Sequence, residues 1–117
     1  MDALSGYHQI PLAKEDQEKT SFVIATGLYY HNVMPFGLKK DGAMYQLLVY
    51  KVFATLIGKR MEVYVDDIIT KSVKETDHVR ELGETFKLLR SYALKLDPKK
   101  CTFGIRSGKF LGYMIYQ

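Results

Sequence analysis

Apolar residues recur at helical spacing in two stretches of the chain. The first stretch predicts a helix from about Gly42 to Leu56, ended by Gly58, with an apolar face made of Met44, Leu47, Leu48, Val52 and Leu56. The second predicts a helix that begins near Ser72–Thr76 and ends before Pro98, with a buried stripe made of Val79, Leu82, Phe86 and Leu89. Ser72 and Glu75 fit a capping box at its start, and Thr76 is an alternative cap.

Short β-prone runs lie around these helices. Ser21–Ala25 and Leu28–Met34 predict two strands joined at Thr26-Gly27, after a helical turn in Glu15–Lys19. Pro35 and Gly37 predict a loop at Met34–Leu38. A second hairpin is predicted from Glu62–Val65 and Ile68–Lys71, with only Asp66-Asp67 between the strands. Phe110–Tyr116 predicts a last strand, paired near Thr102–Ile105.

This order of elements predicts an α+β fold with the helices on one face of an antiparallel sheet. The 117 residues suit one domain, and 47% hydrophobic with 26% charged residues is typical of a globular chain. The single cysteine, Cys101, excludes an internal disulfide and any site with several cysteine ligands. No apolar run approaches the roughly 20 residues of a membrane span, and the chain starts without a signal-peptide pattern, so we expect an intracellular protein with no membrane partner.

The net charge of +4 is concentrated in the last third of the chain. Residues 71–117 hold ten Lys/Arg and five Asp/Glu, whereas residues 1–70 hold seven and eight. A polyanionic partner would explain this excess, and so would an ordinary solvated surface.

The first candidate for chemistry is the acidic turn in Tyr64-Val65-Asp66-Asp67. A hairpin turn of two residues favours Asn-Gly or Asp-Gly, and adjacent like charges repel unless a cation lies beside them. Hard oxygen ligands suit Mg²⁺ or Mn²⁺. The sequence therefore offers two interpretations of the turn, a metal site and an exposed acidic turn.

Six short motifs stand in an order that resembles the reverse transcriptases of gypsy-type LTR retrotransposons. The resemblance covers essentially the entire chain, and the motifs are Asp2–Ile10, Val33–Leu38, Gly42–Gln46, Tyr64–Asp67, Lys100–Phe103 and Phe110–Tyr113. It implies a polymerase palm, a ferredoxin-like βαββαβ antiparallel sheet with helices on one face, formed by residues 1–13 and 35–117. It also implies that residues 14–34 are an inserted part of the fingers hairpin. An RNA-binding domain has a similar layout, but its aromatic stacking motif is missing from the sequence.

The resemblance implies an RNA-directed DNA polymerase that joins a deoxynucleotide to a primer 3′-hydroxyl with the help of two metal ions. Asp2 and Asp66 would hold two Mg²⁺ ions, for which Mn²⁺ is an alternative. Asp67 would support the second ion, and the backbone carbonyl of Ala3 would complete the coordination shell of one ion. The expected partners are an RNA or DNA template with its primer, dNTPs, and the remaining polymerase and RNase H domains of a polyprotein.

Other residues receive roles from the same resemblance, each beside a purely structural alternative. Tyr7 would be the steric gate against a 2′-hydroxyl, or a core tyrosine. Nucleotide contacts are expected from Ser5 and Gly6 through backbone N–H groups, and from Phe36 and Gly37 in a loop that could equally pack on the core. Lys100 would protonate pyrophosphate, or be one of several surface lysines. The primer grip would comprise Phe110, Leu111, Gly112 and Tyr113, which could also be a buried strand.

The sequence departs from the family pattern at Lys40-Asp41, where members commonly carry Asn-Ala. Most of the fingers, the thumb and the RNase H domain would also be missing, and Asp2 would lie on a terminus that frays. We therefore expect the 117 residues alone not to polymerise DNA. The alternative to a polymerase segment is an inactive remnant of a transposon.

Overall fold

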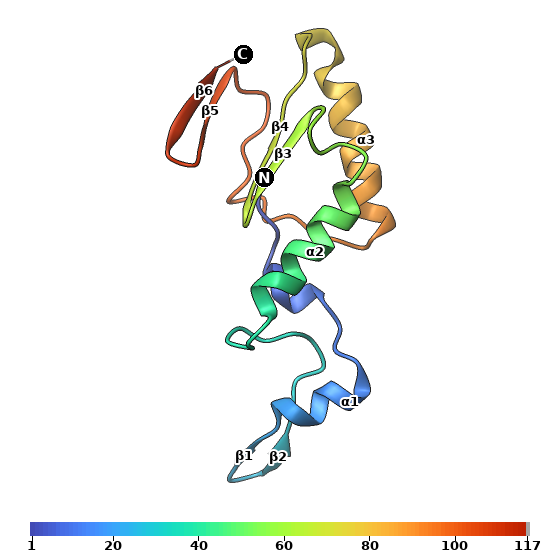
Figure 1. The fold of residues 1–117 in the computed structure, drawn as a ribbon, viewed down its shortest axis with the longest axis vertical. Helices are drawn as coiled ribbons and strands as arrows, with labels where there is room; N and C mark the ends of the chain where they lie inside the picture. The colour runs from blue at the N-terminus through green and yellow to red at the C-terminus, as the bar shows by residue number, and fades with distance from the viewer. Residues whose placement is uncertain (117) are drawn as a thin grey trace.

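The computed structural model describes residues 1–116 of the chain. Helices α2 (Asp41–Phe53) and α3 (His78–Ser91) pack on a hairpin made of β3 (Met61–Tyr64) and β4 (Asp67–Thr70), as Figure 1 shows. One core joins them, because Phe53 of α2, Met61 and Ile68 of the hairpin, and Leu89 of α3 are all at least nine-tenths buried. Both helices therefore cover the same face of this hairpin, the face that carries Met61 and Ile68.

The fold differs from the expected continuous sheet. Residues 1–116 form three separate two-stranded antiparallel sheets, β1–β2, β3–β4 and β5–β6. The α+β arrangement with helices on one face of a hairpin agrees with the prediction, but the βαββαβ sheet is not formed. The first residues of the chain take the place of an extra strand only in part, through one isolated antiparallel bridge between Ala3 and Leu96.

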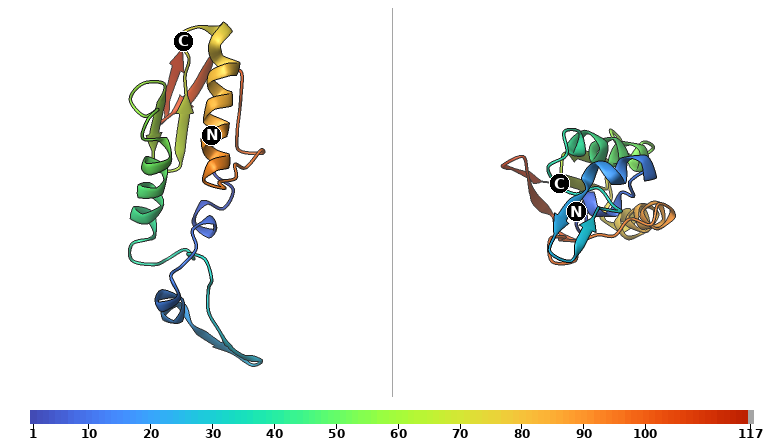
Figure 2. Two further views of the ribbon diagram at one scale, coloured as in Figure 1. Left: turned by 90° about the vertical axis from the view of Figure 1, so that its right-hand side faces the viewer. Right: turned by 90° about the horizontal axis from the view of Figure 1, so that it is seen from below.

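The segment that the resemblance assigns to the fingers projects from one end of the molecule. It contains α1 (Lys14–Gln17), a 3-10 turn at Glu18–Thr20, β1 (Phe22–Ile24) and β2 (Gly27–Tyr29), which together give the molecule an elongated form of 57 × 28 × 22 Å (Figures 1 and 2). The helical turn and hairpin predicted here are present, although the strands are shorter than predicted and the turn is Ala25-Thr26. The division into palm residues 1–13 and 35–117 and fingers residues 14–34 stays a prediction.

The two hairpins nearer the C-terminus have registers that the sequence did not predict. The β3–β4 turn is Val65-Asp66, because Asp67 pairs with Tyr64 as part of β4. The expected single strand over Phe110–Tyr116 is wrong. It is a hairpin of β5 (Ser107–Phe110) and β6 (Tyr113–Tyr116), turning at Leu111-Gly112. Both turn residues have positive φ, 51° and 79°, as a type I′ turn requires.

The bounds of helix α2 agree with the prediction within a few residues. Its predicted apolar face is wrong in part, because Met44 and Leu47 are 49% and 63% exposed, and the buried residues are Tyr45, Val49, Val52 and Phe53.

The start of α3 also differs from its prediction. A 3-10 turn at Glu75–Asp77 precedes α3, and no side chain caps either element, so the expected capping box is absent. Ser72 instead hydrogen-bonds His78 Nδ1 at 2.9 Å. Val79, expected in the buried stripe, is 80% exposed, and the buried residues of α3 are Thr85 and the predicted Leu89.

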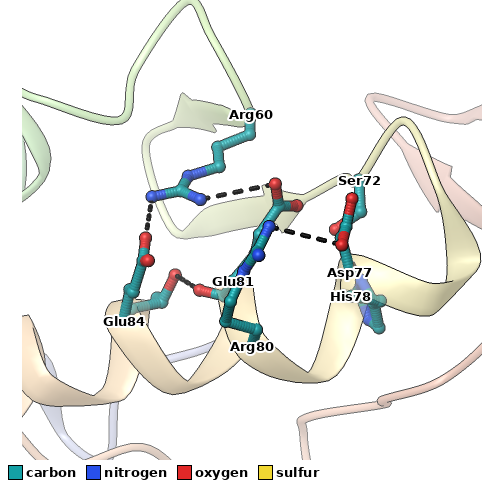
Figure 3. Close-up of polar contacts among 8 residues, drawn as sticks. Arg60, Ser72, Asp77, His78, Arg80, Glu81 and Glu84 are labelled. Atoms are coloured by element: carbon teal, nitrogen blue, oxygen red, sulfur yellow. Dashed lines mark hydrogen bonds and ion pairs between the residues drawn. The ribbon is translucent and has the colours of Figure 1, made fainter.

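Arg60 joins the first half of α3 to the residue that precedes β3. Its guanidinium pairs with Glu81 at 3.5 Å and with Glu84, as Figure 3 shows. A hydrogen bond from Ser72, and then the charge of Arg60, lower the pKa of the Glu81 carboxyl. The hairpin that carries Asp66 is therefore tied to α3 by a charge network as well as by the apolar core.

Candidate active site

A pocket of about 240 Å³ brings four distant parts of the chain together. They are the N-terminal segment, the Phe36 loop with the start of α2, the β3–β4 turn, and the segment after α3. The lining residues are Asp2, Ala3, Leu4, Ser5, Gly6, Tyr7, Phe36, Tyr45, Asp66, Asp97 and Lys100. Most of the residues expected to act on the metals and the nucleotide therefore share one pocket.

Backbone hydrogen bonds hold the Asp2 segment on both sides. Met1 exchanges hydrogen bonds with Ile68 of β4, and on the other side Asp97 N–H donates to the Asp2 carbonyl at 3.0 Å. The Cys101 sulfur lies 3.4 Å from the Asp2 nitrogen. The expected fraying of this segment is therefore not what the structure shows, because Met1–Leu4 are paired with two neighbouring segments.

Asp66 reaches the pocket from a strained turn. Val65, the residue before it, has φ of 51°, a left-handed conformation that is unfavourable for a β-branched side chain. Strain of this kind costs about 1–3 kcal/mol and is concentrated at functional sites. The turn thereby aims Asp66 at the pocket, while the neighbouring Asp67 enters the strand.

Tyr45 of α2 forms the back of the pocket and was not predicted from the sequence. It is 3% exposed, and burial, followed by the charges of Asp66 and Asp2, raises the pKa of its hydroxyl to about 12. A β-carbon on Gly6 would lie 2.4 Å from Tyr45 Cε2. Glycine at position 6 is therefore required by the space that the ring occupies.

An aromatic group surrounds the gate candidate Tyr7. Its ring centroid lies 4.7 Å from that of Phe36 and 5.2 Å from that of Tyr45. Burial and then the charges of Asp66 and Asp41 raise the pKa of the Tyr7 hydroxyl. Tyr7 is thus both packed and pocket-facing, so the two interpretations offered for it are compatible.

Asp41 stabilises the loop that carries Phe36. Its carboxylate accepts hydrogen bonds from Gly37 N–H at 2.8 Å and from Gly42 N–H at 2.6 Å. An acidic residue in the first turn of a helix is also favourable to the helix dipole. The departure at Lys40-Asp41 therefore has a structural role, because Asp41 binds the loop backbone. Gly37 itself, with φ of 91°, lies outside the pocket lining.

Lys100 and Asp97 complete the pocket on the side of the chain that follows α3. Lys100 Nζ lies 3.7 Å from Asp2 Oδ2, which places a positive charge beside the first carboxylate. Asp97 accepts a hydrogen bond from Lys99 N–H at 3.0 Å and contributes a third acidic side chain to the lining, one that the sequence did not suggest.

Asp67 and the four expected primer-grip residues lie outside the pocket, as Gly37 does. Asp67 and Phe110 line a larger adjoining cleft of about 1050 Å³, which Asp2 and Lys100 also reach. Leu111 and Gly112 form the β5–β6 turn, and Tyr113 is 76% exposed, so the buried-strand alternative for this segment is wrong. Within residues 1–116, no three Asp, Glu, His or Cys side chains form a cluster that could hold a metal. The Asp67 and primer-grip assignments stay predictions.

The sequence profile described as "Reverse transcriptase (RNA-dependent DNA polymerase)" matches residues 1–115. The chain belongs to the reverse transcriptase family. This reverse transcriptase chain is 39% identical over 115 residues to the "Retrovirus-related Pol polyprotein from transposon gypsy" of Drosophila melanogaster. It is 35% identical to the corresponding polyprotein of transposon 297 from the same species, and 30% identical to a Tf2-3 transposon polyprotein of Schizosaccharomyces pombe.

The matches cover nearly all of this chain and a small part of each relative. The gypsy match spans 98% of the chain and 11% of the relative. The reverse transcriptase chain also resembles the foamy viral protease–reverse transcriptase in complex with an RNA/DNA hybrid, with a TM-score of 0.87, 26% identity, and coverage of 99% of this chain and 16% of that one. It is therefore a segment of a reverse transcriptase of the retrotransposon Pol type. None of the helices in residues 1–116 has the length and apolar character needed to cross a membrane.

Proposed function

We propose that this segment carries the reacting centre of an RNA-directed DNA polymerase, in which Asp2 and Asp66 bind two Mg²⁺ ions, or Mn²⁺. The observation that supports it most directly is that these two carboxylates, distant in sequence, line one pocket with Tyr7. Carboxylate oxygens and the Ala3 carbonyl are the hard donors that such ions prefer. When bound, the ions would lower the pKa of the primer hydroxyl and neutralise charge on the triphosphate.

The protein's own groups bind and orient the remaining reactants. Ser5 and Gly6 offer backbone N–H groups toward the triphosphate, and Tyr7 excludes a 2′-hydroxyl by its bulk. Lys100, already beside Asp2, would supply a proton or positive charge to the leaving pyrophosphate. Phe36 and Gly37 would border the incoming nucleotide, and Asp67 would support the second ion.

The substrates we propose are dNTPs and an RNA or DNA template with its primer. The β5–β6 hairpin, with Phe110, Leu111, Gly112 and Tyr113, would hold the primer strand along the adjoining cleft. The foamy viral relative, described with an RNA/DNA hybrid, supports a template–primer ligand. Further polymerase and RNase H domains of a polyprotein are the proposed covalent partners, since the chain spans 11% of its gypsy relative.

The metal assignment is tested by Mn²⁺ binding to the purified chain, followed by electron paramagnetic resonance. We expect binding that weakens at least about tenfold in Asp66→Asn, because one of two anionic ligands becomes neutral. Asp77→Asn is the matched control, since Asp77 pairs with Arg80 far from the pocket lining. Equal Mn²⁺ affinity in the wild type and Asp66→Asn would contradict the assignment.

Polymerisation is tested with a chimera, in which this chain replaces the matching segment of the gypsy polyprotein. We expect the chimera to extend a DNA primer on an RNA template, and the same chimera with Asp66→Asn to be inactive. Failure of the unaltered chimera, with its expression intact, would favour the alternative, a transposon-derived remnant without catalytic activity. The expectation that the 117 residues alone do not polymerise stays a prediction.

A further inference from the structure

The side chain of Tyr45 has a polar group that the fold itself leaves unused. Its ring is 97% buried against Gly6 and Tyr7, since only 3% of the residue is exposed. Within residues 1–116 the hydroxyl makes no hydrogen bond, although it lies 3.0 Å from the position that a Gly6 β-carbon would occupy. The hydroxyl is therefore a donor that remains available to a molecule entering the pocket.

The position of Tyr45 directs that hydroxyl at the ligand. The residue lines the pocket together with Asp2, Asp66 and Gly6, and both carboxylates are close enough to Tyr45 for their charge to act on it. A carboxylate of Asp2 or Asp66 that holds a cation has fewer lone pairs left to accept the Tyr45 proton. Oxygen atoms of a ligand held by the cations would be further acceptors in the same pocket.

We propose that Tyr45 is a further nucleotide-binding residue of this pocket, whose hydroxyl donates a hydrogen bond to a phosphate oxygen of the metal-bound nucleotide. The inference rests on the proposed function and deepens it. The room for the hydroxyl comes from Gly6, because any larger residue there would push the ring away. The hydroxyl of a tyrosine is protonated at neutral pH, so it is a donor beside the two carboxylates of the pocket.

The test is Tyr45→Phe, which keeps the ring that packs on Gly6 and Tyr7 and removes only the oxygen. Binding of dTTP in the presence of Mn²⁺ is measured by titration calorimetry on the complete chain, beside Mn²⁺ binding without nucleotide. We expect the affinity for dTTP with Mn²⁺ to fall about tenfold or more, as for a lost hydrogen bond to a charged group. Mn²⁺ binding alone and the urea unfolding midpoint should stay close to wild type.

Two comparisons separate this inference from the proposed function. If Asp66→Asn abolishes dTTP binding while Tyr45→Phe matches the wild type, the Tyr45 inference is wrong and the metal site stands. If the wild type binds neither Mn²⁺ nor dTTP, both are wrong. A loss in Tyr45→Phe that affects Mn²⁺ alone as strongly as dTTP would show that Tyr45 supports the carboxylates and does not contact the nucleotide. Tyr92→Phe, at an exposed tyrosine, controls for loss of a hydroxyl elsewhere.

Discussion

Glycine is needed at position 6 because the Tyr45 ring occupies the space that a side chain there would fill. No positive φ requires glycine at this position, in contrast to Gly37 or Gly112. The requirement comes from the Tyr45 ring, whose Cε2 and Cζ atoms would lie 2.4 and 2.8 Å from a β-carbon. The segment that contains Gly6 and helix α2 are therefore held at a distance that only glycine permits.

Gly6→Ala should destabilise the chain by about 1–3 kcal/mol, the usual cost of overpacking a closely packed site. The free energy of unfolding in urea measures it. Gly83→Ala is the matched control, because no atom lies within 4 Å of the β-carbon it would add, and alanine is favoured in the middle of helix α3. A Gly6→Ala variant as stable as the wild type would mean that the ring moves aside freely.

At the scale of elements, the Gln9 side chain joins two segments of the candidate site. Its amide nitrogen donates to the carbonyls of Leu4 and Lys95, the latter at 2.9 Å, and its oxygen accepts from Lys95 N–H at 2.7 Å. One side chain thus repeats the pairing that the Leu4 N–H already makes with the Lys95 carbonyl at 2.9 Å. Gln9 fixes the Asp2 segment against the segment that carries Asp97 and Lys100.

Gln9→Ala should weaken Mn²⁺ binding several-fold and lower the free energy of unfolding by about 1–2 kcal/mol, since exposed hydrogen bonds each contribute about 0.5–1.5 kcal/mol. The chain offers a close control in Gln17→Ala. Gln17 Nε2 also donates to a carbonyl five residues earlier, that of Leu12 at 3.0 Å, but in the inserted segment. Equal effects of the two substitutions on Mn²⁺ affinity would remove the role we assign to Gln9.

The registers of the strands were the features hardest to predict from the sequence. The pattern placed Asp66-Asp67 between two strands, and the true turn is one residue earlier because Val65 accepts a left-handed conformation. Sequence rules would have assigned that conformation to Gly or Asn. The same shift separates the two aspartates, because Asp66 lies in the turn whereas Asp67 is the first residue of β4. It explains why Asp66 lines the pocket and Asp67 the adjoining cleft.

At the scale of the whole molecule, alkaline pH should unfold the chain through Tyr45. The folded Tyr45 keeps its proton up to about pH 12, whereas an unfolded tyrosine loses it near 10.0. Between these values the unfolded state binds fewer protons, so the free energy of unfolding is highest below pH 10 and falls as pH rises toward 12. The fall attributable to Tyr45 is up to about 2 kcal/mol.

Urea unfolding at about pH 9 and about pH 11 measures this effect. Between these two conditions, Tyr45→Phe should lose less stability than the wild type, and Tyr92→Phe should lose as much as the wild type. An identical fall in Tyr45→Phe would show that other tyrosines and lysines, and not Tyr45, determine the alkaline limit.

The sequence predicted the helices and most of the candidate site, and the reasons are local. Apolar periodicity located α2, and the ordered motifs named Asp2, Tyr7, Asp66 and Lys100, which the structure brings to one pocket. No local pattern pointed to a site role for Tyr45 or Asp97, because their places in the pocket depend on segments far away in sequence. The prediction of one continuous sheet differs from the structure for the same reason, because strand pairing between distant segments leaves little local signal in the sequence.

The contact between Gly6 and Tyr45 also constrains the order in which the sequence can change over generations. A side chain added at position 6 while the ring is present meets atoms 2.4 Å away, so that step is costly when taken first. A smaller residue at position 45 would open the space beforehand, after which position 6 could grow at little cost. Descendants of this chain with a larger residue at 6 should therefore have passed through a change at 45, and the path between the two permitted pairs runs through glycine at 6 with a small residue at 45.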